Sequence, residues 1–157
     1  LFTSDEEGIE YYEKIIISPG PGIPSESHQI IDIIQKYAPT KSILGICLGH
    51  QAICEAFQGK IKNLSKVYHG VSSEITILDS EQILFKSLPK SINVARYHSW
   101  AIDENHIGNN LKVTSISEDG TIMSVKHEWY DVQGIQFHPE SILTPDGEQI
   151  MKNWLEN

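Results

Sequence analysis

The stretch at residues 43–49 reads Ile-Leu-Gly-Ile-Cys-Leu-Gly, and it decides the fold. Its first four residues form a short apolar run typical of a buried strand, and glycines around the cysteine permit a tight turn. An apolar pattern at helical spacing follows and stops at Gly59. The same order occurs earlier in the chain. Residues 12–18 end in an apolar run typical of a strand, a Pro-Gly loop follows, and residues 25–37 show a helical pattern that Ser25 is placed to cap. This alternation predicts parallel strands joined by crossovers, hence an α/β domain.

The rest of the chain carries strand and turn patterns. Strand patterns lie around Val67 and over residues 74–78, 93–98, 111–117, 121–128 and 132–137. Asp119-Gly120 is typical of a hairpin, and residues 144–146, Thr-Pro-Asp, are suited to the start of a last helix. We therefore expect one domain over residues 1–157: a flavodoxin-like layered α/β fold with a largely parallel central sheet, helices on both faces and an additional antiparallel portion.

The composition excludes two classes of partner. Hydrophobic residues make up 39% of the chain, and no apolar run approaches the roughly 18 residues that a membrane span needs. The net charge of −9, with 21 acidic and 12 basic side chains, is unfavourable for binding a nucleic acid. The two cysteines, Cys47 and Cys54, are spaced so that they cannot easily bridge, which favours a reducing, cytoplasmic location.

Cys47 is the candidate nucleophile. The flanking glycines at positions 45 and 49 give the strand-turn-helix pattern of a nucleophile elbow, which exposes one side chain at a helix N-terminus. There the helix dipole favours a thiolate, and the Leu48 N–H is placed to donate to an oxyanion. The alternative is that Cys47 is a buried small apolar residue, which is the interpretation we favour for Cys54.

A nucleophilic thiol needs a base with an orienting partner, and His138 is the best-placed histidine. Because Pro139 favours an extended His138, and residues two apart in extended chain point the same way, Glu140 can reach the imidazole. His98 is the rival base, but no carboxylate lies within a few residues of it. His50 and Cys47 lack a second pair of metal-ligand spacing, so we expect no metal site.

The loop at residues 18–22, Ser-Pro-Gly-Pro-Gly, lacks the lysine of a phosphate-binding loop. Its prolines are stiff and its glycines leave the backbone bare, which suits presenting N–H groups to a substrate carbonyl. A purely structural tight turn is the alternative.

Three segments taken in chain order carry a resemblance to a known family. They are residues 18–22, residues 45–51 (Gly-Ile-Cys-Leu-Gly-His-Gln) and residues 137–141 (Phe-His-Pro-Glu-Ser). Together they closely resemble the class I (triad) glutamine amidotransferases. Within that family, residues 96–100 and 138–147 look most like anthranilate synthase component II and its para-aminobenzoate counterpart, and the similarity runs from about Ile15 to the C-terminus.

The resemblance implies that L-glutamine is hydrolysed through a thioester on Cys47, with His138 as base and then acid, and Glu140 orienting it. It further implies an oxyanion hole made by backbone N–H groups, those of Gly20 and Leu48. The residues that it implies contact glutamine, the last two mainly through their backbones, are Gly22, Gln51, Ser99 and Trp100. No cofactor is expected in this subunit.

The resemblance also implies a partner, a chorismate-using synthase subunit (component I) that receives the ammonia to make anthranilate. Alternatives are para-aminobenzoate synthesis, service to both pathways, a freestanding γ-glutamyl hydrolase or cysteine peptidase, and a non-catalytic scaffolding subunit. The family opens with a strand and helix that this sequence lacks before Leu1. We therefore expect a missing N-terminal βα segment and a gap in the middle of the parallel sheet.

Overall fold

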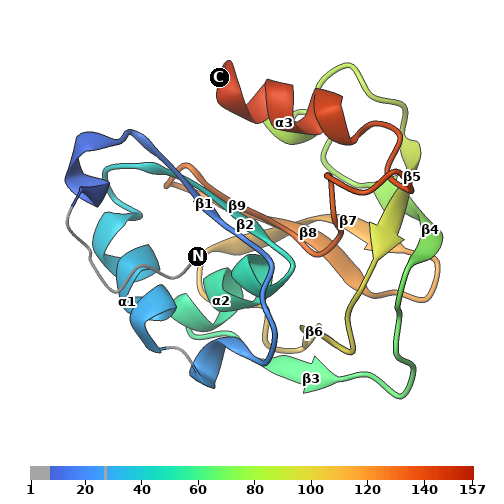
Figure 1. The fold of residues 1–157 in the computed structure, drawn as a ribbon, viewed down its shortest axis with the longest axis horizontal. Helices are drawn as coiled ribbons and strands as arrows, with labels where there is room; N and C mark the ends of the chain where they lie inside the picture. Colours follow the sequence, from blue (N-terminus) through green and yellow to red (C-terminus); the bar gives the residue numbers. More distant parts are fainter. Residues whose placement is uncertain (1–7, 27) are drawn as a thin grey trace.

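The computed structural model describes residues 8–26 and 28–157, which form a sheet with helices on both faces (Figure 1). The strands are β1 (Lys14–Ile17), β2 (Ser42–Ile46), β3 (Ile61–Asn63), β4 (Val71–Ile77), β5 (Ser91–Arg96), β6 (Trp100–Ile102), β7 (Leu111–Ser117), β8 (Ile122–His127) and β9 (Val132–Ile135). The α-helices are α1 (His28–Tyr37), α2 (Leu48–Ala56) and α3 (Gly147–Leu155). Short 3₁₀ turns are η1 (Ile9–Tyr11), η2 (Pro24–Glu26) and η3 (Ile83–Phe85).

The main sheet has the strand order β1-β2-β9-β8-β7-β4-β5, and β3 and β6 form a separate antiparallel pair. Parallel pairing joins β1 to β2 and β2 to β9. The pairs from β9 through β8, β7 and β4 to β5 are antiparallel. The α/β class is confirmed, and the antiparallel portion is larger than the sequence predicted, because the long-range pairing of β4 with β7 adds strands to the sheet.

Strand β1 lies at an edge of the described sheet. It pairs with β2 along its whole length, from Lys14 opposite Ser42 to Ile17 opposite Gly45. The parallel part is therefore continuous within residues 8–26 and 28–157, and the expected gap in its middle is not present there.

The two faces of the sheet carry separate cores. Neighbouring residues of β2 point to opposite faces, and Ile43 packs in the cluster that includes α1 and α2, whereas Leu44 packs with α3. Ile34 and Ile53 are fully buried in the first cluster, and Trp154 is nearly so in the second. Figure 1 shows α1 and α2 on one side of the sheet and α3 on the other, as predicted. No helix in the described part of the chain is long and apolar enough to span a membrane.

Some local expectations are wrong. Helix α1 begins at His28 and Ser25 lies in η2, so Ser25 does not cap α1. Helix α3 begins after Asp146 rather than Thr144. The strand expected around Val67 is absent, because Val67 lies outside any strand. The preceding strand is β3, which pairs with β6 in a separate antiparallel sheet. The hairpin at Asp119-Gly120 is confirmed, because it joins the antiparallel strands β7 and β8.

Candidate active site

Cys47 sits in a sharp turn between β2 and α2. Its backbone has φ 53° and ψ −98°, a strained conformation for a residue with a side chain. The turn depends on close backbone packing: a Cβ on Gly45 would strike the backbone of Gly49, and a Cβ on Gly49 would strike the carbonyl of Ile17. The Cys47 N–H donates to the carbonyl of Ile135 at 2.8 Å, which ties the turn to β9. The strand, sharp turn and helix predicted from the sequence are all present.

The thiol of Cys47 is protonated at rest. Burial raises its pKa to about 11, the charge of Glu140 acts in the same direction, and hydrogen bonds from the Leu48 N–H and the Gln136 amide offset this only in part. The Leu48 N–H at the helix N-terminus does lower the pKa, in the expected direction, but loss of solvation outweighs it and the net pKa is raised. Attack by this sulfur requires a base that removes its proton.

His138 and Glu140 form the predicted pair. Nδ1 of His138 lies 2.7 Å from Oε1 of Glu140, and Nε2 is buried without a hydrogen-bond partner among the described residues. The backbone of His138 is held on both sides, by its N–H donating to Ala95 at 3.1 Å and by Thr144 Oγ1 donating to its carbonyl at 2.7 Å. Glu140 thus fixes the orientation of the His138 ring, and Nε2 is left available to accept or donate a proton.

Tyr97 links the histidine to the cysteine. Its ring meets the His138 ring edge-on with 5.0 Å between centroids, and its backbone carbonyl lies 4.0 Å from Cys47 Sγ. Because β2 and β9 are parallel, with Ile46 opposite Ile135, Cys47 and the His138 segment leave the sheet at the same edge. Ligands bind at this carboxyl edge in open α/β sheets. The structure therefore brings Cys47, His138 and Glu140 to one site.

The predicted oxyanion residues also lie together. A Cβ built on Gly20 would come within 2.8 Å of Cδ2 of Leu48, so the Pro-Gly loop packs directly on the start of α2. The Leu48 N–H is directed at the cysteine sulfur, as its effect on the thiol shows. Gly22 has a positive φ of 81°, and a Cβ built on it would meet the carboxylate of Glu26.

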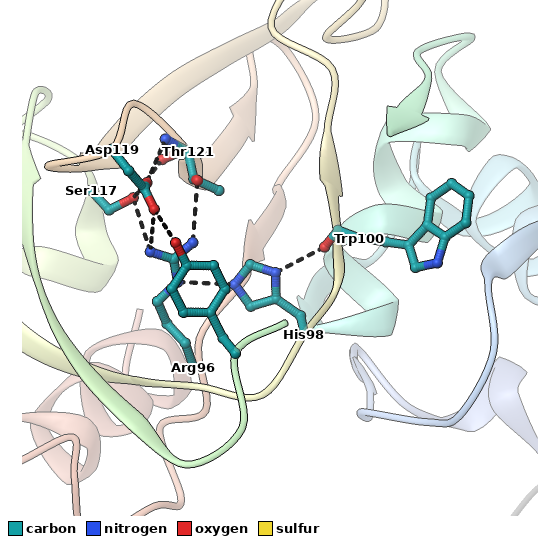
Figure 2. Close-up of polar contacts among 7 residues, drawn as sticks. Arg96, His98, Trp100, Ser117, Asp119 and Thr121 are labelled. Carbon is teal, nitrogen blue, oxygen red and sulfur yellow. Dashed lines mark hydrogen bonds and ion pairs between the residues drawn. The ribbon is translucent and has the colours of Figure 1, made fainter. Parts of the chain in front are cut away.

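The remaining predicted glutamine contacts meet at the Trp100 carbonyl. Buried Gln51 donates from Nε2 to this oxygen at 2.9 Å and to Oε1 of Gln136 at 3.1 Å. The Ser99 carbonyl accepts from the Leu64 N–H at 2.7 Å. Figure 2 shows the Trp100 carbonyl turned toward His98 and its indole pointing away. The structure thus brings Gln51, Ser99 and Trp100 together.

Sequence reasoning missed Gln136 and Tyr97. Gln136 is fully buried and directs Nε2 at Cys47 Sγ, 3.7 Å away. Its place directly after β9 and two residues before His138 was a usable signal. Tyr97 had no such signal, since its carbonyl is brought to Cys47 by strands far apart in the chain.

The rival histidines are engaged elsewhere. Nδ1 of His98 lies 2.9 Å from the Trp100 carbonyl and Nε2 lies 3.1 Å from Nε of Arg96, so neither nitrogen is available as a base. Burial lowers the pKa of His50 to about 3, which leaves it neutral. Within the described residues, no cluster of three or more His, Cys, Asp or Glu side chains is arranged to hold a metal ion. Cys47 and Cys54 are both free and buried, as expected from their spacing.

A buried thiol, a carboxylate-oriented imidazole and adjacent N–H donors are the elements of covalent acyl transfer. The thiol supplies the nucleophile, the free Nε2 of His138 can take its proton, and the N–H donors can stabilise an oxyanion.

Comparison with known proteins identifies the family. The profile of the family described as glutamine amidotransferase class-I matches residues 2–157. Aminodeoxychorismate synthase component 2 of Escherichia coli (strain K12) is 43% identical over 143 residues, covering 91% of this chain and 75% of that protein. Anthranilate synthase component 2 of Porphyra purpurea is 44% identical over 146 residues, covering 92% and 76%. The crystal structure of a glutamine amidotransferase from Thermotoga maritima has a TM-score of 0.69 at 20% identity, covers 96% of this chain and 64% of that one, and supports the fold. The chain belongs to the class-I glutamine amidotransferase family.

Proposed function

We propose that this chain is the glutaminase subunit of a chorismate-using synthase, with Cys47, His138 and Glu140 as its catalytic residues. The observation that carries the proposal is the 2.7 Å contact between His138 and Glu140, which leaves Nε2 of the histidine unpartnered beside the Cys47 elbow. A neutral thiol, whose pKa is raised to about 11, makes a base indispensable at neutral pH.

The first half-reaction forms a thioester. Nε2 of His138 takes the proton of the Cys47 thiol as the sulfur attacks the carboxamide carbon of glutamine. The carbonyl oxygen becomes an oxyanion that accepts hydrogen bonds from the N–H groups of Gly20 and Leu48. The imidazolium, stabilised by Glu140, then protonates the leaving nitrogen, the C–N bond breaks, and ammonia departs from a γ-glutamyl thioester.

The second half-reaction releases glutamate. Neutral His138 removes a proton from water as the water oxygen attacks the thioester carbon, and the same N–H donors stabilise the second oxyanion. Collapse breaks the C–S bond, and the imidazolium returns its proton to the Cys47 sulfur. The thiol and the base are restored, and the net reaction is hydrolysis of glutamine to glutamate and ammonia.

Gly22, Gln51, Ser99 and Trp100 are the proposed contacts for the rest of the glutamine. The Trp100 carbonyl already accepts from Gln51 and His98, and a carbonyl oxygen has two lone pairs. The Ser99 carbonyl accepts from Leu64. We therefore expect Trp100 to contact glutamine through its N–H group rather than its carbonyl oxygen, whereas the Ser99 carbonyl keeps one lone pair that can accept from glutamine.

The proposed recipient of the ammonia is the component I subunit, which makes anthranilate. Ammonia is mostly protonated in neutral water, so its delivery to a partner keeps it reactive. The E. coli relative is an aminodeoxychorismate synthase component, and this name favours the para-aminobenzoate pathway, or service to both, as the second candidate. In either case the subunit is proposed to hold no cofactor and to work in the cytoplasm.

Substitution of the nucleophile tests the function. In the assembled complex, Cys47→Ser should abolish glutamine-dependent product formation and leave ammonia-dependent formation intact. Equal loss of both activities would contradict the proposal. Pairing the purified subunit with each of the two synthase subunits distinguishes the pathways.

Two rival functions have their own outcomes. A freestanding hydrolase or peptidase should cleave γ-glutamyl peptides without a partner, and no such cleavage is expected here. A scaffolding subunit should support ammonia-dependent synthesis by its partner but show no turnover of glutamine in the complex.

A further inference from the structure

Arg96 lies almost completely buried, with 1% of its surface exposed, and its guanidinium is surrounded by acceptors. Nη1 donates to Asp119 at 3.0 Å and Nη2 donates to Thr121 at 3.2 Å (Figure 2). The ring of Tyr68 covers its flat face, with the centroid 3.5 Å from Cζ. Burial opposes ionisation of Asp119, yet hydrogen bonds from Ser117, Tyr68 and Thr121 outweigh it and hold the pKa of this carboxyl well below its usual range. The cluster is thus an ion pair between a buried guanidinium and the more exposed carboxylate of Asp119 at the β7–β8 turn.

A further guanidinium contact sets the tautomer of His98. A guanidinium can only donate, so Nε2 of His98, 3.1 Å from Nε of Arg96, must be the acceptor. The single proton of the neutral ring then lies on Nδ1 and is donated to the Trp100 carbonyl at 2.9 Å. Burial and the Arg96 charge lower the pKa of His98 to about 4, so the ring remains in this form. A buried arginine thereby converts His98 into a donor of fixed direction.

The Trp100 carbonyl is where this donor meets the candidate active site. Gln51 donates to the same oxygen and to Gln136, and Gln136 in turn donates to Cys47 Sγ. His98 and Gln51 therefore hold the Trp100 carbonyl, and with it the peptide between Trp100 and Ala101, from two directions. That peptide belongs to the segment proposed above to bind glutamine, and it begins β6 immediately after Ser99.

We propose that Arg96 and His98 are positioning residues for glutamine: Arg96 fixes His98 as an Nδ1–H donor, and His98 holds the Trp100 carbonyl, which belongs to the peptide between Trp100 and Ala101. The inference rests on the proposed glutaminase function and deepens it. Neither side chain touches the reacting atoms in this scheme. By holding the Trp100 carbonyl they restrict the backbone of residues 99 and 100, in the segment proposed above to contact glutamine, and this affects binding more than bond breaking.

A matched pair of substitutions tests the proposal. In His98→Asn the amide nitrogen occupies the place of Nδ1 and can still donate to Trp100, whereas in His98→Gln the amide lies at the place of Nε2 and serves only Arg96. We expect His98→Gln to raise the KM for glutamine about tenfold, the value of one lost hydrogen bond. We expect His98→Asn to stay within about threefold of the wild type, with kcat little changed in both.

Thermal unfolding of both variants separates positioning from folding. Both substitutions remove the imidazole ring that stacks on Tyr68, so both should lose stability to a similar extent. A purely structural role would then raise KM equally in the two, and that result would overturn the proposal.

A second measurement does not depend on the folding of a His98 variant. Nitrogen-15 NMR of the histidines in the full-length wild-type protein should show His98 protonated on Nδ1 and unprotonated on Nε2 at neutral pH. The opposite tautomer would overturn the proposal. Wild-type protein that neither releases glutamate in the complex nor forms an adduct at Cys47 would instead remove the glutaminase function itself. Active wild type with equal KM in both variants would remove only the role of Arg96 and His98.

Discussion

Nδ1 of His138 lies 2.7 Å from a carboxylate oxygen of Glu140, two residues further along the chain. The intervening proline and the hydrogen bonds to Ala95 and Thr144 hold the backbone of this pair in place. This contact leaves a single nitrogen of His138, Nε2, to exchange protons with Cys47. The catalytic consequences of the pair can be measured one residue at a time.

Glu140→Gln should lower kcat for glutamine hydrolysis and raise the rate at which Cys47 is alkylated. Loss of the carboxylate leaves the imidazolium unstabilised, so kcat for glutamine hydrolysis should fall by about 10²- to 10⁴-fold. The Glu140 charge also raises the pKa of Cys47. Its removal should lower that pKa and speed alkylation of Cys47 by iodoacetamide in the absence of substrate. Slower alkylation alongside lower kcat would contradict this arrangement.

Gln136→Leu tests the amide that faces the sulfur. The Gln136 hydrogen bond lowers the pKa of Cys47, so its loss should raise that pKa and slow alkylation at a fixed pH. Removing one such bond should reduce kcat/KM about tenfold. Gln82→Leu is the matched control, because Gln82 is also buried but donates to Gln133 at 3.1 Å. If both variants alkylate at the same rate, the Gln136 contact with Cys47 has no effect on the thiol.

Gly49→Ala should disrupt the elbow. The new Cβ would strike the backbone carbonyl of Ile17, so something in the packed elbow must shift, at a cost of about 3 kcal/mol or more in unfolding free energy. Gly120→Ala is the control: its Cβ meets nothing within 4 Å, and only the positive φ of 79° opposes it. That strain should cost about 1 kcal/mol. Similar urea midpoints for the two variants would show that the elbow is not closely packed.

His98 should make stability depend on pH. Its pKa is lowered from an ordinary 6.5 to about 4, first by burial and then by Arg96. Between these values the unfolded chain binds a proton that the folded protein does not, so stability is full above about pH 6.5 and falls as the pH drops toward 4. His98→Asn cannot titrate and should show a shallower fall, by about 1 to 3 kcal/mol over this window. Parallel curves in denaturant titrations at pH 4.5 and 7 would contradict this.

The parts of the site that could be predicted are those set by local geometry. The Cys47 turn follows from two glycines between an apolar strand and a helix. The His138–Glu140 contact was also predicted, but the expected extended geometry is wrong: residues 138–141 form a turn, in which the Ser141 N–H donates to the His138 carbonyl at 3.3 Å. The protonation state of Cys47 could not be predicted in the same way. Its position at a helix N-terminus, which lowers the pKa, is visible in the local sequence, whereas its burial, which raises the pKa, depends on the whole fold. The sequence also underestimated the antiparallel strands, since β4 pairs with β7 across more than thirty residues of chain.

Contacts made through the backbone were equally hidden. The carbonyl of Tyr97 contacts Cys47 and that of Trp100 contacts Gln51 because the end of β5 and the start of β6 lie near α2, which no local pattern specifies. Thr144 matched a helix cap by residue type, but the fold uses its hydroxyl to tie Ala95 to His138.

Covalent labelling tests the proposed chemistry most directly. The full-length protein, in complex with its synthase subunit, is treated with a diazoketone analogue of glutamine and analysed by peptide mass spectrometry. We predict one adduct, on Cys47, that excess glutamine prevents and that is absent from Cys47→Ser and strongly reduced in His138→Ala. Cys54 serves as an internal control, because burial raises its pKa to about 12. No adduct on Cys47, or equal labelling of Cys54, would contradict the assignment of Cys47 as the glutaminase nucleophile.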